Sequence, residues 1–223
     1  MTIDLEHNSN ADIVRIFFIR HGQTDHNVKK IIQGHHDIDI NDNGVQQAKT
    51  LGKFIEKVKF DKMFSSDLVR CVNTSKEILE FQDCDFVTSQ NWRERCMGKS
   101  EGLHIQDAIA KYGEDFRNLG EKHHELVGRL VEAFDLVVAE SIEKGYTNVA
   151  ICSHGGSITA FFDYLYTHGF KLNGLTKSDL RVPFNTSVSV VDVAKYTKLG
   201  TIQMFGNTRH LGADYRVQDQ RLR

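Results

Sequence analysis

Short apolar segments alternate along this chain with longer segments whose apolar residues recur at helical spacing. The apolar segments predict strands at 14–19, 62–65, 85–88 and 147–152, followed by a hairpin-like pair at 187–193 and 201–205. Apolar residues at helical spacing predict a shorter helix at 105–112 and a long one at 121–143, among others. Strands that alternate with helices predict a three-layer α/β/α fold, with a mostly parallel sheet and helices on both faces.

The chain shows no boundary between domains. It has 223 residues, a single proline (Pro183), and no linker rich in glycine, serine or proline. Residues 1–12 are polar, and we expect them to form a disordered tail. Residues 13–223 are therefore predicted to fold as one domain that buries most of its apolar surface.

Composition excludes several classes of partner. The net charge is −2, from 28 basic and 30 acidic residues, so no overall field favours nucleic acid or an anionic membrane. The apolar runs are too short to cross a bilayer, and the polar start of the chain lacks the apolar core of a signal peptide. The four cysteines have no C-x-x-C spacing, so we expect reduced thiols and a cytoplasmic protein, with a nuclear location also compatible.

Two histidines directly follow predicted strands, and each lies beside glycine. His21 is preceded by Arg20, and His154 is followed by Gly155. Ligands of open α/β sheets bind at the carboxyl ends of the strands, so both histidines are expected at one site. A neutral imidazole can attack phosphorus, and an arginine offers a planar set of donors that fits phosphate oxygens. The pattern therefore predicts phosphoryl transfer with a histidine nucleophile.

Further blocks extend this pattern along nearly the whole chain, from about residue 13 to about residue 208. They lie, in order, at 19–27, 33–34, 65–74, 93–102 and 153–156. This ordered set resembles the histidine phosphatase superfamily in its phosphoglycerate-mutase-like branch, and within it the small fungal broad-specificity phosphatases. The resemblance implies a phosphoglycerate-mutase-like fold in which a helical insertion lies over the active site. It places an acid loop and cap segment at about 90–145 of a single catalytic domain.

The resemblance also implies roles for individual residues. His21 is expected to be the nucleophile, Glu94 the general acid and base, and protonated His154 a stabiliser of the transferred phosphoryl group. The substrate phosphate is expected to be bound by a further set: Arg20, Arg70, Asn27, Gln33, Thr24 and Gly155. The expected enzyme is a phosphatase that hydrolyses small phosphorylated metabolites through a phosphohistidine, without cofactor or metal.

Three other functions stay open. A phosphoglycerate mutase of the same family is disfavoured, because the chain lacks a long basic insertion after Glu101-Gly102. A sugar bisphosphatase would differ only in its substrate. A non-catalytic protein that binds phosphorylated ligands is disfavoured because none of His21, Arg70, Glu94 and His154 has been lost.

Some polar residues receive no assigned role. The pairs His35-His36 and His123-His124 lack the i, i+4 spacing of a helical zinc site, so we expect surface positions. The role of Glu121 and that of the basic C-terminal tail are open. So are the natural substrate and the oligomeric state, for which a homodimer is one alternative.

Overall fold

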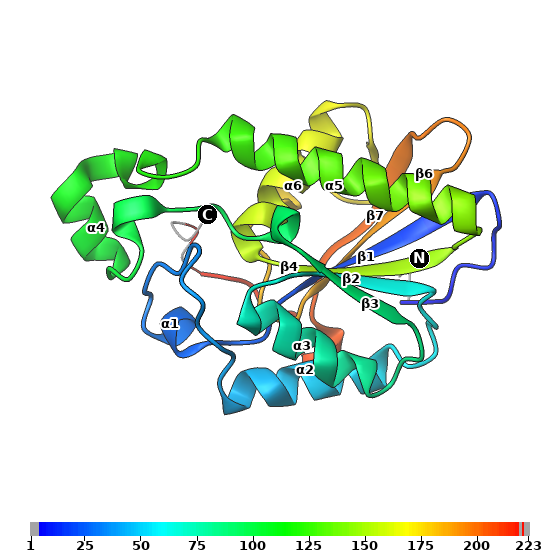
Figure 1. Ribbon diagram of the computed structural model, residues 1–223, viewed down its shortest axis with the longest axis horizontal. Coiled ribbons are helices and arrows are strands. Elements are labelled where there is room, and N and C mark those ends of the chain that lie inside the picture. Colours follow the sequence, from blue (N-terminus) through cyan, green and yellow to red (C-terminus); the bar gives the residue numbers. More distant parts are fainter. Residues whose placement is uncertain (1–4, 219, 221–223) are drawn as a thin grey trace.

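The computed structural model describes residues 5–218 and 220 (Figure 1). In these residues, seven strands form one sheet in the order β3-β2-β4-β1-β6-β7-β5. The strands are β1 (Ile13–Arg20), β2 (Lys62–Ser66), β3 (Asp85–Ser89), β4 (Asn148–Ser153), β5 (Lys171–Leu172), β6 (Val188–Ala194) and β7 (Gly200–Asn207).

The sheet is mostly parallel, as predicted. Strands β3, β2, β4 and β1 run parallel, whereas β6 is antiparallel to β1, and β7 is antiparallel to β6. The predicted hairpin-like pair is thus confirmed as β6 and β7. The sequence analysis missed β5, which has only two residues and pairs with the edge of β7.

The helices cover both faces of the sheet, which confirms the three-layer arrangement. Figure 1 shows α2 and α3 below the sheet, and α5 and α6 above it. The helices are α1 (Asp25–Val28), α2 (Asp42–Phe54), α3 (Val69–Leu79), α4 (Ile105–Tyr112), α5 (His123–Lys144) and α6 (Gly155–Thr167). Single turns of 3-10 helix are η1 (Gln90–Trp92), η2 (Gly98–Ser100), η4 (Lys177–Asp179) and η5 (Arg209–Leu211), and η3 (Gly113–Asn118) is longer.

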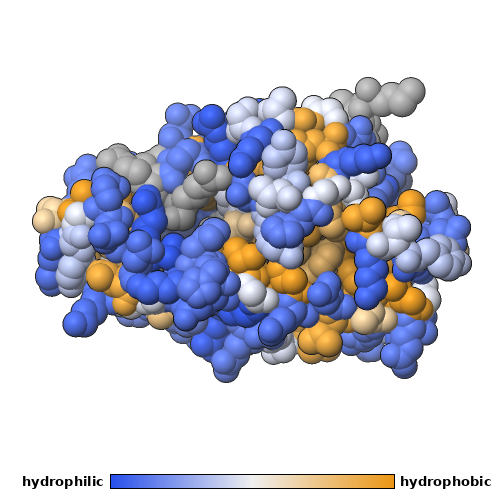
Figure 2. Space-filling model, turned by 90° about the horizontal axis from the view of Figure 1, so that it is seen from above, coloured by the Kyte–Doolittle hydropathy of each residue, from blue (hydrophilic) through white to orange (hydrophobic). Residues whose placement is uncertain are grey.

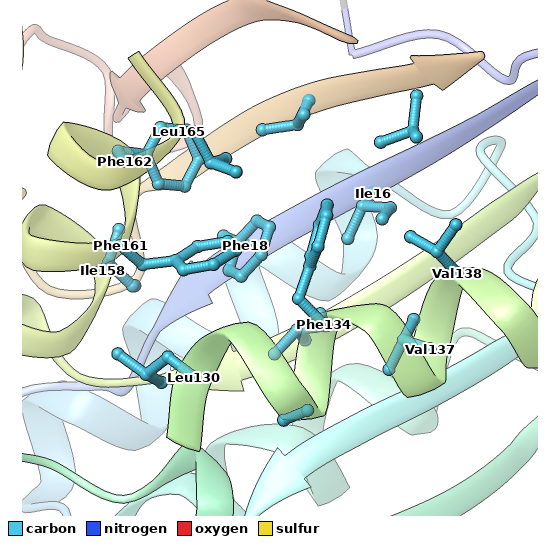
Figure 3. Close-up of a cluster of buried hydrophobic side chains, with 14 of the residues drawn as sticks. Ile16, Phe18, Leu130, Phe134, Val137, Val138, Ile158, Phe161, Phe162 and Leu165 are labelled. Carbon is cyan, nitrogen blue, oxygen red and sulfur yellow. The ribbon is translucent and has the colours of Figure 1, made fainter. Parts of the chain in front are cut away.

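The central strand β1 is buried on both faces because successive side chains point to opposite sides of a sheet. Phe18 enters the cluster formed with α5 and α6, where its ring centroid lies 5.2 Å from that of Phe162 (Figure 3). Phe17 enters the opposite cluster, 5.2 Å from the ring of Phe60. This double burial fixes the end of β1, and therefore the position of His21.

The cap has a small hydrophobic core of its own. It contains Ile32, Met97, Ile105, Ala108 and Phe116, which come from the loop after α1 and from the segment between β3 and α5. In Figure 1 this part projects to the left of the sheet around α4. A separate core lets the cap stand beside the carboxyl ends of the strands without belonging to the main layers.

The prediction of a disordered tail is wrong for residues 5–12. Asn8 is buried, its backbone N–H donates to Oδ1 of Asn148 at 2.8 Å, and Nδ2 of Asn148 donates back to the Asn8 carbonyl at 2.8 Å. Asn148 is fully buried at the start of β4, so its amide needs these partners. The rest of the predicted tail, residues 1–4, lies outside the described residues.

The face of the molecule on the α5 side is mainly hydrophilic (Figure 2). On this face, hydrophilic residues surround patches of hydrophobic ones. Leu136 of α5 is also exposed. Among the described helices, none combines the length and the apolar character that a membrane span needs.

Candidate active site

The ends of β1 and β4 bring the two predicted histidines together. Arg20 pairs in register with Ser153, and the backbone N–H of His21 donates to the Ser153 carbonyl at 3.0 Å. The imidazole centroids of His21 and His154 lie 5.3 Å apart. Parallel strand ends therefore place both rings at one edge of the sheet, beside the cap.

The His21 ring is held in one orientation. Its Nδ1 lies 2.8 Å from the carbonyl oxygen of Gly22 and donates to it, which leaves Nε2 with a free lone pair. Burial lowers the pKa of His21 well below 6.5, and the cations Arg70 and Arg20 lower it further. His21 is therefore neutral at physiological pH, the state that a nucleophile requires.

Two buried arginines flank this ring. Nη1 and Nη2 of Arg70 donate to the carbonyls of His36 and Gly34 at 2.8 and 2.7 Å, which anchors its guanidinium. Nη1 of Arg20 donates to the carbonyl of Pro183 at 2.6 Å, and its buried Nε has no partner among the described residues. Burial lowers the pKa of Arg20 to about 10, which still leaves it positively charged at neutral pH.

His154 differs from the expectation of a protonated ring. Its Nδ1 accepts from Nε of Arg70 at 3.1 Å, and its Nε2 lies 2.9 Å from the Ser66 hydroxyl. Burial and the Arg70 charge lower the pKa of His154 well below 6.5. In the free site His154 is thus neutral, with Nδ1 accepting from Arg70 and Nε2–H donating to Ser66. His154 is fully buried and does not line the cavity described below.

Glu94 reaches the same site from the loop after η1. Its Oε2 accepts from the N–H of Gly156 at 2.9 Å, at the start of α6. Its Oε1 accepts from the N–H of Arg95 at 2.9 Å and from the Ser157 hydroxyl at 3.1 Å. A Cβ at position 156 would lie 2.7 Å from Oε1, so glycine is needed there for the carboxylate to approach.

The remaining predicted phosphate ligands divide into two groups. Asn27 and Gln33 line the cavity described below, and their side-chain oxygens are engaged by Thr24 Oγ1 at 3.1 Å, which leaves their NH2 groups for a ligand. Thr24 itself is fully buried and does not line that cavity. Gly155 is not a lining residue either, and a Cβ there would lie 3.1 Å from Nε of Arg20. Thr24 therefore positions other residues, and Gly155 makes room for Arg20.

A cavity of about 690 Å³ extends from His21 to the cap, and its lining includes Arg20, Asn27, Gln33, Arg70 and Glu94. Apolar cap residues such as Met97 and Phe116 form part of its wall. Acidic lining residues are Glu94 and Asp163. The cationic lining residues outnumber them: Arg20, Arg70, Arg95, Arg117, Lys177 and Arg181. The cavity thus suits an anionic ligand, although the net charge of the whole chain is close to zero.

The sequence analysis missed several of these contributions. Lys177 and Arg181 come from the loop after β5, where no periodic or motif signal marked them. Ser66 lies within a block that was singled out, but its contact with His154 depends on how β2 and β4 pair. Asn185, whose amide donates to the His21 carbonyl at 3.0 Å, lies outside all of the motif blocks.

The adjacent histidine pairs do not share one environment. Nε2 of His35 lies 2.8 Å from the Glu94 carbonyl and the residue is half-buried, so His35 is not the surface residue that was predicted. His36 and His123 are exposed, as predicted, although His123 also lines the cavity. His124 is exposed, as predicted. Among the described residues, no group of three or more His, Cys, Asp or Glu side chains could hold a metal ion.

A histidine outside the site should make stability depend on pH. Burial lowers the pKa of His210 to about 4, whereas a histidine in an unfolded chain has a pKa near 6.5. Between these values the unfolded state binds the extra proton, so stability falls as the pH is lowered. We expect His210→Gln to reduce this slope by about 1.4 kcal/mol per pH unit, measured by urea unfolding between pH 6 and pH 5. An unchanged slope would contradict this assignment.

Comparison with known proteins places most of the chain in one family. The family model described as "Histidine phosphatase superfamily (branch 1)" matches residues 16–205. A broad-specificity phosphatase of Saccharomyces cerevisiae is 41% identical over 226 residues, covering 97% of this chain and 96% of the yeast protein. A 2,3-bisphosphoglycerate-dependent phosphoglycerate mutase of Buchnera aphidicola is 28% identical, covering 78% and 91% of the two chains.

Solved structures share the fold. The crystal structure of a phosphoglycerate mutase from Bacillus anthracis aligns with a TM-score of 0.76 at 22% identity, covering 91% of this chain and 97% of that one. The family match spans the strands that carry His21 and His154 and the loop that carries Glu94. The chain therefore belongs to the histidine phosphatase superfamily, branch 1.

Proposed function

We propose that this protein is a phosphatase that hydrolyses phosphate monoesters of small molecules through a phosphohistidine on His21. The observation that carries the proposal is the geometry of that ring. Its Nδ1 is held by the Gly22 carbonyl, and Arg20 and Arg70 stand beside it in a cationic cavity. The similarity to a yeast broad-specificity phosphatase supports the same activity.

In the first step, the lone pair on Nε2 of His21 forms the N–P bond while the bond between phosphorus and the leaving oxygen breaks. The charge of this transition state is spread over the equatorial phosphate oxygens. Arg20, Arg70 and the NH2 group of Asn27 line the cavity and are placed to stabilise it. His154, which is fully buried, supports them by accepting from Nε of Arg70. The leaving oxygen takes its proton from the Glu94 carboxyl.

In the second step, the Glu94 carboxylate accepts a proton from a water molecule whose oxygen attacks phosphorus. The P–N bond breaks, its electron pair returns to Nε2 of His21, and inorganic phosphate leaves. Glu94 thereby regains the proton that it gave in the first step, and His21 is again neutral.

The cavity indicates what kind of ester is accepted. A volume of about 690 Å³ holds far more than a phosphate group, and its walls combine apolar cap residues with Arg95, Arg117 and Arg181. This favours phosphorylated metabolites with a sizeable, partly anionic alcohol. Only α4 and η3 lie between Gly102 and the end of the cap, so the long basic insertion that would favour a mutase is lacking in this described segment.

A reducing compartment is consistent with the thiols. Cys71, Cys84, Cys96 and Cys152 are all free. Free thiols are usual in the cytosol, which supports the cytoplasmic location that we propose.

Vanadate is expected to inhibit the enzyme in competition with substrate. Its five-coordinate form resembles the in-line transition state, and such mimics bind more tightly than substrates do. The measurement is release of inorganic phosphate from a panel of phosphate esters at increasing vanadate concentrations. A crystal soaked with vanadate should show the ion against His21, Arg20 and Arg70. Hydrolysis without inhibition, or an ion bound away from these residues, would contradict the proposed site.

A further inference from the structure

Arg129 of α5 contacts the backbone of the loop that carries Glu94. Its Nη1 donates to the carbonyls of Asn91 and Arg93 at 2.9 and 2.8 Å, and its Nη2 donates to the Glu94 carbonyl at 2.9 Å. One guanidinium therefore binds three carbonyl groups within four residues. Such charge-assisted hydrogen bonds are stronger than those between neutral groups.

The Arg129 side chain starts beside buried leucines of α5, and its guanidinium forms an ion pair with Glu121. Leu126 and Leu130, which flank Arg129 on α5, are buried in the main hydrophobic cluster. Nε and Nη2 of Arg129 also donate to the two carboxylate oxygens of Glu121, at 2.6 and 2.9 Å. Burial opposes ionisation of Glu121, but the contact with Arg129 outweighs it and lowers the pKa of that carboxyl. The pair is thus charged at neutral pH.

The Glu121 end of this pair joins the two ends of the cap. Its Oε2 accepts from the N–H of Cys96 at 3.3 Å, and its own N–H donates to the Cys96 carbonyl at 2.9 Å. Its carbonyl accepts from Nε of Arg95 at 2.8 Å. The chain enters the cap after Cys96 and leaves it at Glu121, just before α5. The hydrogen bonds between Glu121 and Cys96 therefore join the two ends of the cap segment.

The Glu94 backbone is therefore held from two sides while its carboxylate faces the cavity. His35 lies against the same carbonyl that Arg129 binds, and Gly156 and Ser157 hold the carboxylate. We propose that Arg129 is a positioning residue for Glu94 and that Glu121 couples this positioning to the cap. The proposal rests on the proposed function, in which Glu94 protonates the leaving group.

The test uses two substrates that need the acid to different degrees. An alkyl phosphate has a poor leaving group and depends on protonation, whereas p-nitrophenyl phosphate depends on it little. For Arg129→Met we expect single-turnover phosphorylation by the alkyl ester to slow about 10²-fold, the order of loss that a 1 Å misplacement of a catalytic group produces. The loss with p-nitrophenyl phosphate should be much smaller.

A double-mutant cycle shows whether Arg129 acts through Glu94. If it does, the double variant Arg129→Met with Glu94→Gln should phosphorylate the alkyl ester about as slowly as Glu94→Gln alone. If Arg129→Met slowed phosphorylation by the alkyl ester by the same factor in the wild type and in Glu94→Gln, the proposal would be overturned. Equal losses on both substrates in the single variant would overturn it too, because a general structural defect would slow both.

The chain offers a matched control. Nε and Nη2 of Arg15 bind the two oxygens of Asp192 at 2.7 Å each, away from the cavity, and Arg15 and Arg129 have the same side-chain exposure of 17%. Arg15→Met should leave the ratio of the two phosphorylation rates unchanged.

If Arg129→Met does not fold, Glu121→Gln tests the same network, because the amide keeps its shape and loses its charge. It should reduce the alkyl rate selectively, although less than the loss of Arg129. An unchanged rate ratio in Glu121→Gln would overturn the coupling to the cap. A wild-type protein that hydrolyses no ester would instead refute the proposed function, so the two failures are distinguishable.

Discussion

Replacing His21 with alanine is expected to abolish turnover while oxyanion binding is largely retained. The substitution removes the ring nitrogen whose free lone pair faces the cavity beside Arg20 and Arg70. Both arginines are anchored by backbone carbonyls, of Pro183 for Arg20 and of His36 and Gly34 for Arg70, and not by His21. The anion pocket should therefore persist, and vanadate should still bind.

The covalent intermediate can be identified by its chemistry. Rapid quench of the wild-type enzyme with a ³²P-labelled ester should trap a phosphoenzyme that is labile in acid and stable in alkali, as a P–N bond is. An acyl phosphate on Glu94 or Asp67 would instead be labile to alkali and hydroxylamine. The exposed His124 gives a control, and His124→Ala should form the adduct normally. Turnover in His21→Ala, or a hydroxylamine-sensitive adduct, would refute the mechanism.

Much of this fold could be predicted because apolar runs and polar connections alternate sharply. The predicted strand at 14–19 is observed at Ile13–Arg20, and that at 147–152 at Asn148–Ser153. The prediction of a disordered tail, which the structure contradicts, depended on long-range contacts. Residues 5–12 look like a free tail only until Asn148, far along the chain, is seen to need the amide of Asn8.

The sequence predicted which residues form the site, whereas their protonation states and contacts follow from the geometry. Motif order identified His154, but its neutral form follows from the Arg70 donor that occupies Nδ1. Thr24 lies in the same motif as Asn27, but it is fully buried, and its hydroxyl donates to Oδ1 of Asn27. The contacts of Arg129 could not be predicted, because backbone carbonyls carry no sequence signal.

Glu94→Gln is expected to slow phosphoryl transfer from alkyl phosphates by roughly 10²–10⁴-fold, the usual contribution of general acid–base catalysis. Glutamine keeps the shape and can still accept from Arg95 and Ser157, but it cannot give a proton to the leaving oxygen. p-Nitrophenyl phosphate, which leaves without protonation, should lose much less in single-turnover phosphorylation. Hydrolysis of the phosphoenzyme should slow for both substrates, because activating the water needs the same carboxylate.

Replacing a neighbouring carboxylate, that of Glu101, distinguishes acid catalysis by Glu94 from a simple loss of negative charge. Oε1 of Glu101 accepts from the N–H groups of His35 and Met97 at 3.0 and 2.7 Å, so it too is bound by backbone donors beside the acid loop. It does not line the cavity. Glu101→Gln should therefore leave the ratio of the alkyl and nitrophenyl rates unchanged. If Glu94→Gln slowed phosphorylation by both esters equally, Glu94 would not be the acid, and the proton would have to come from another group facing the leaving oxygen.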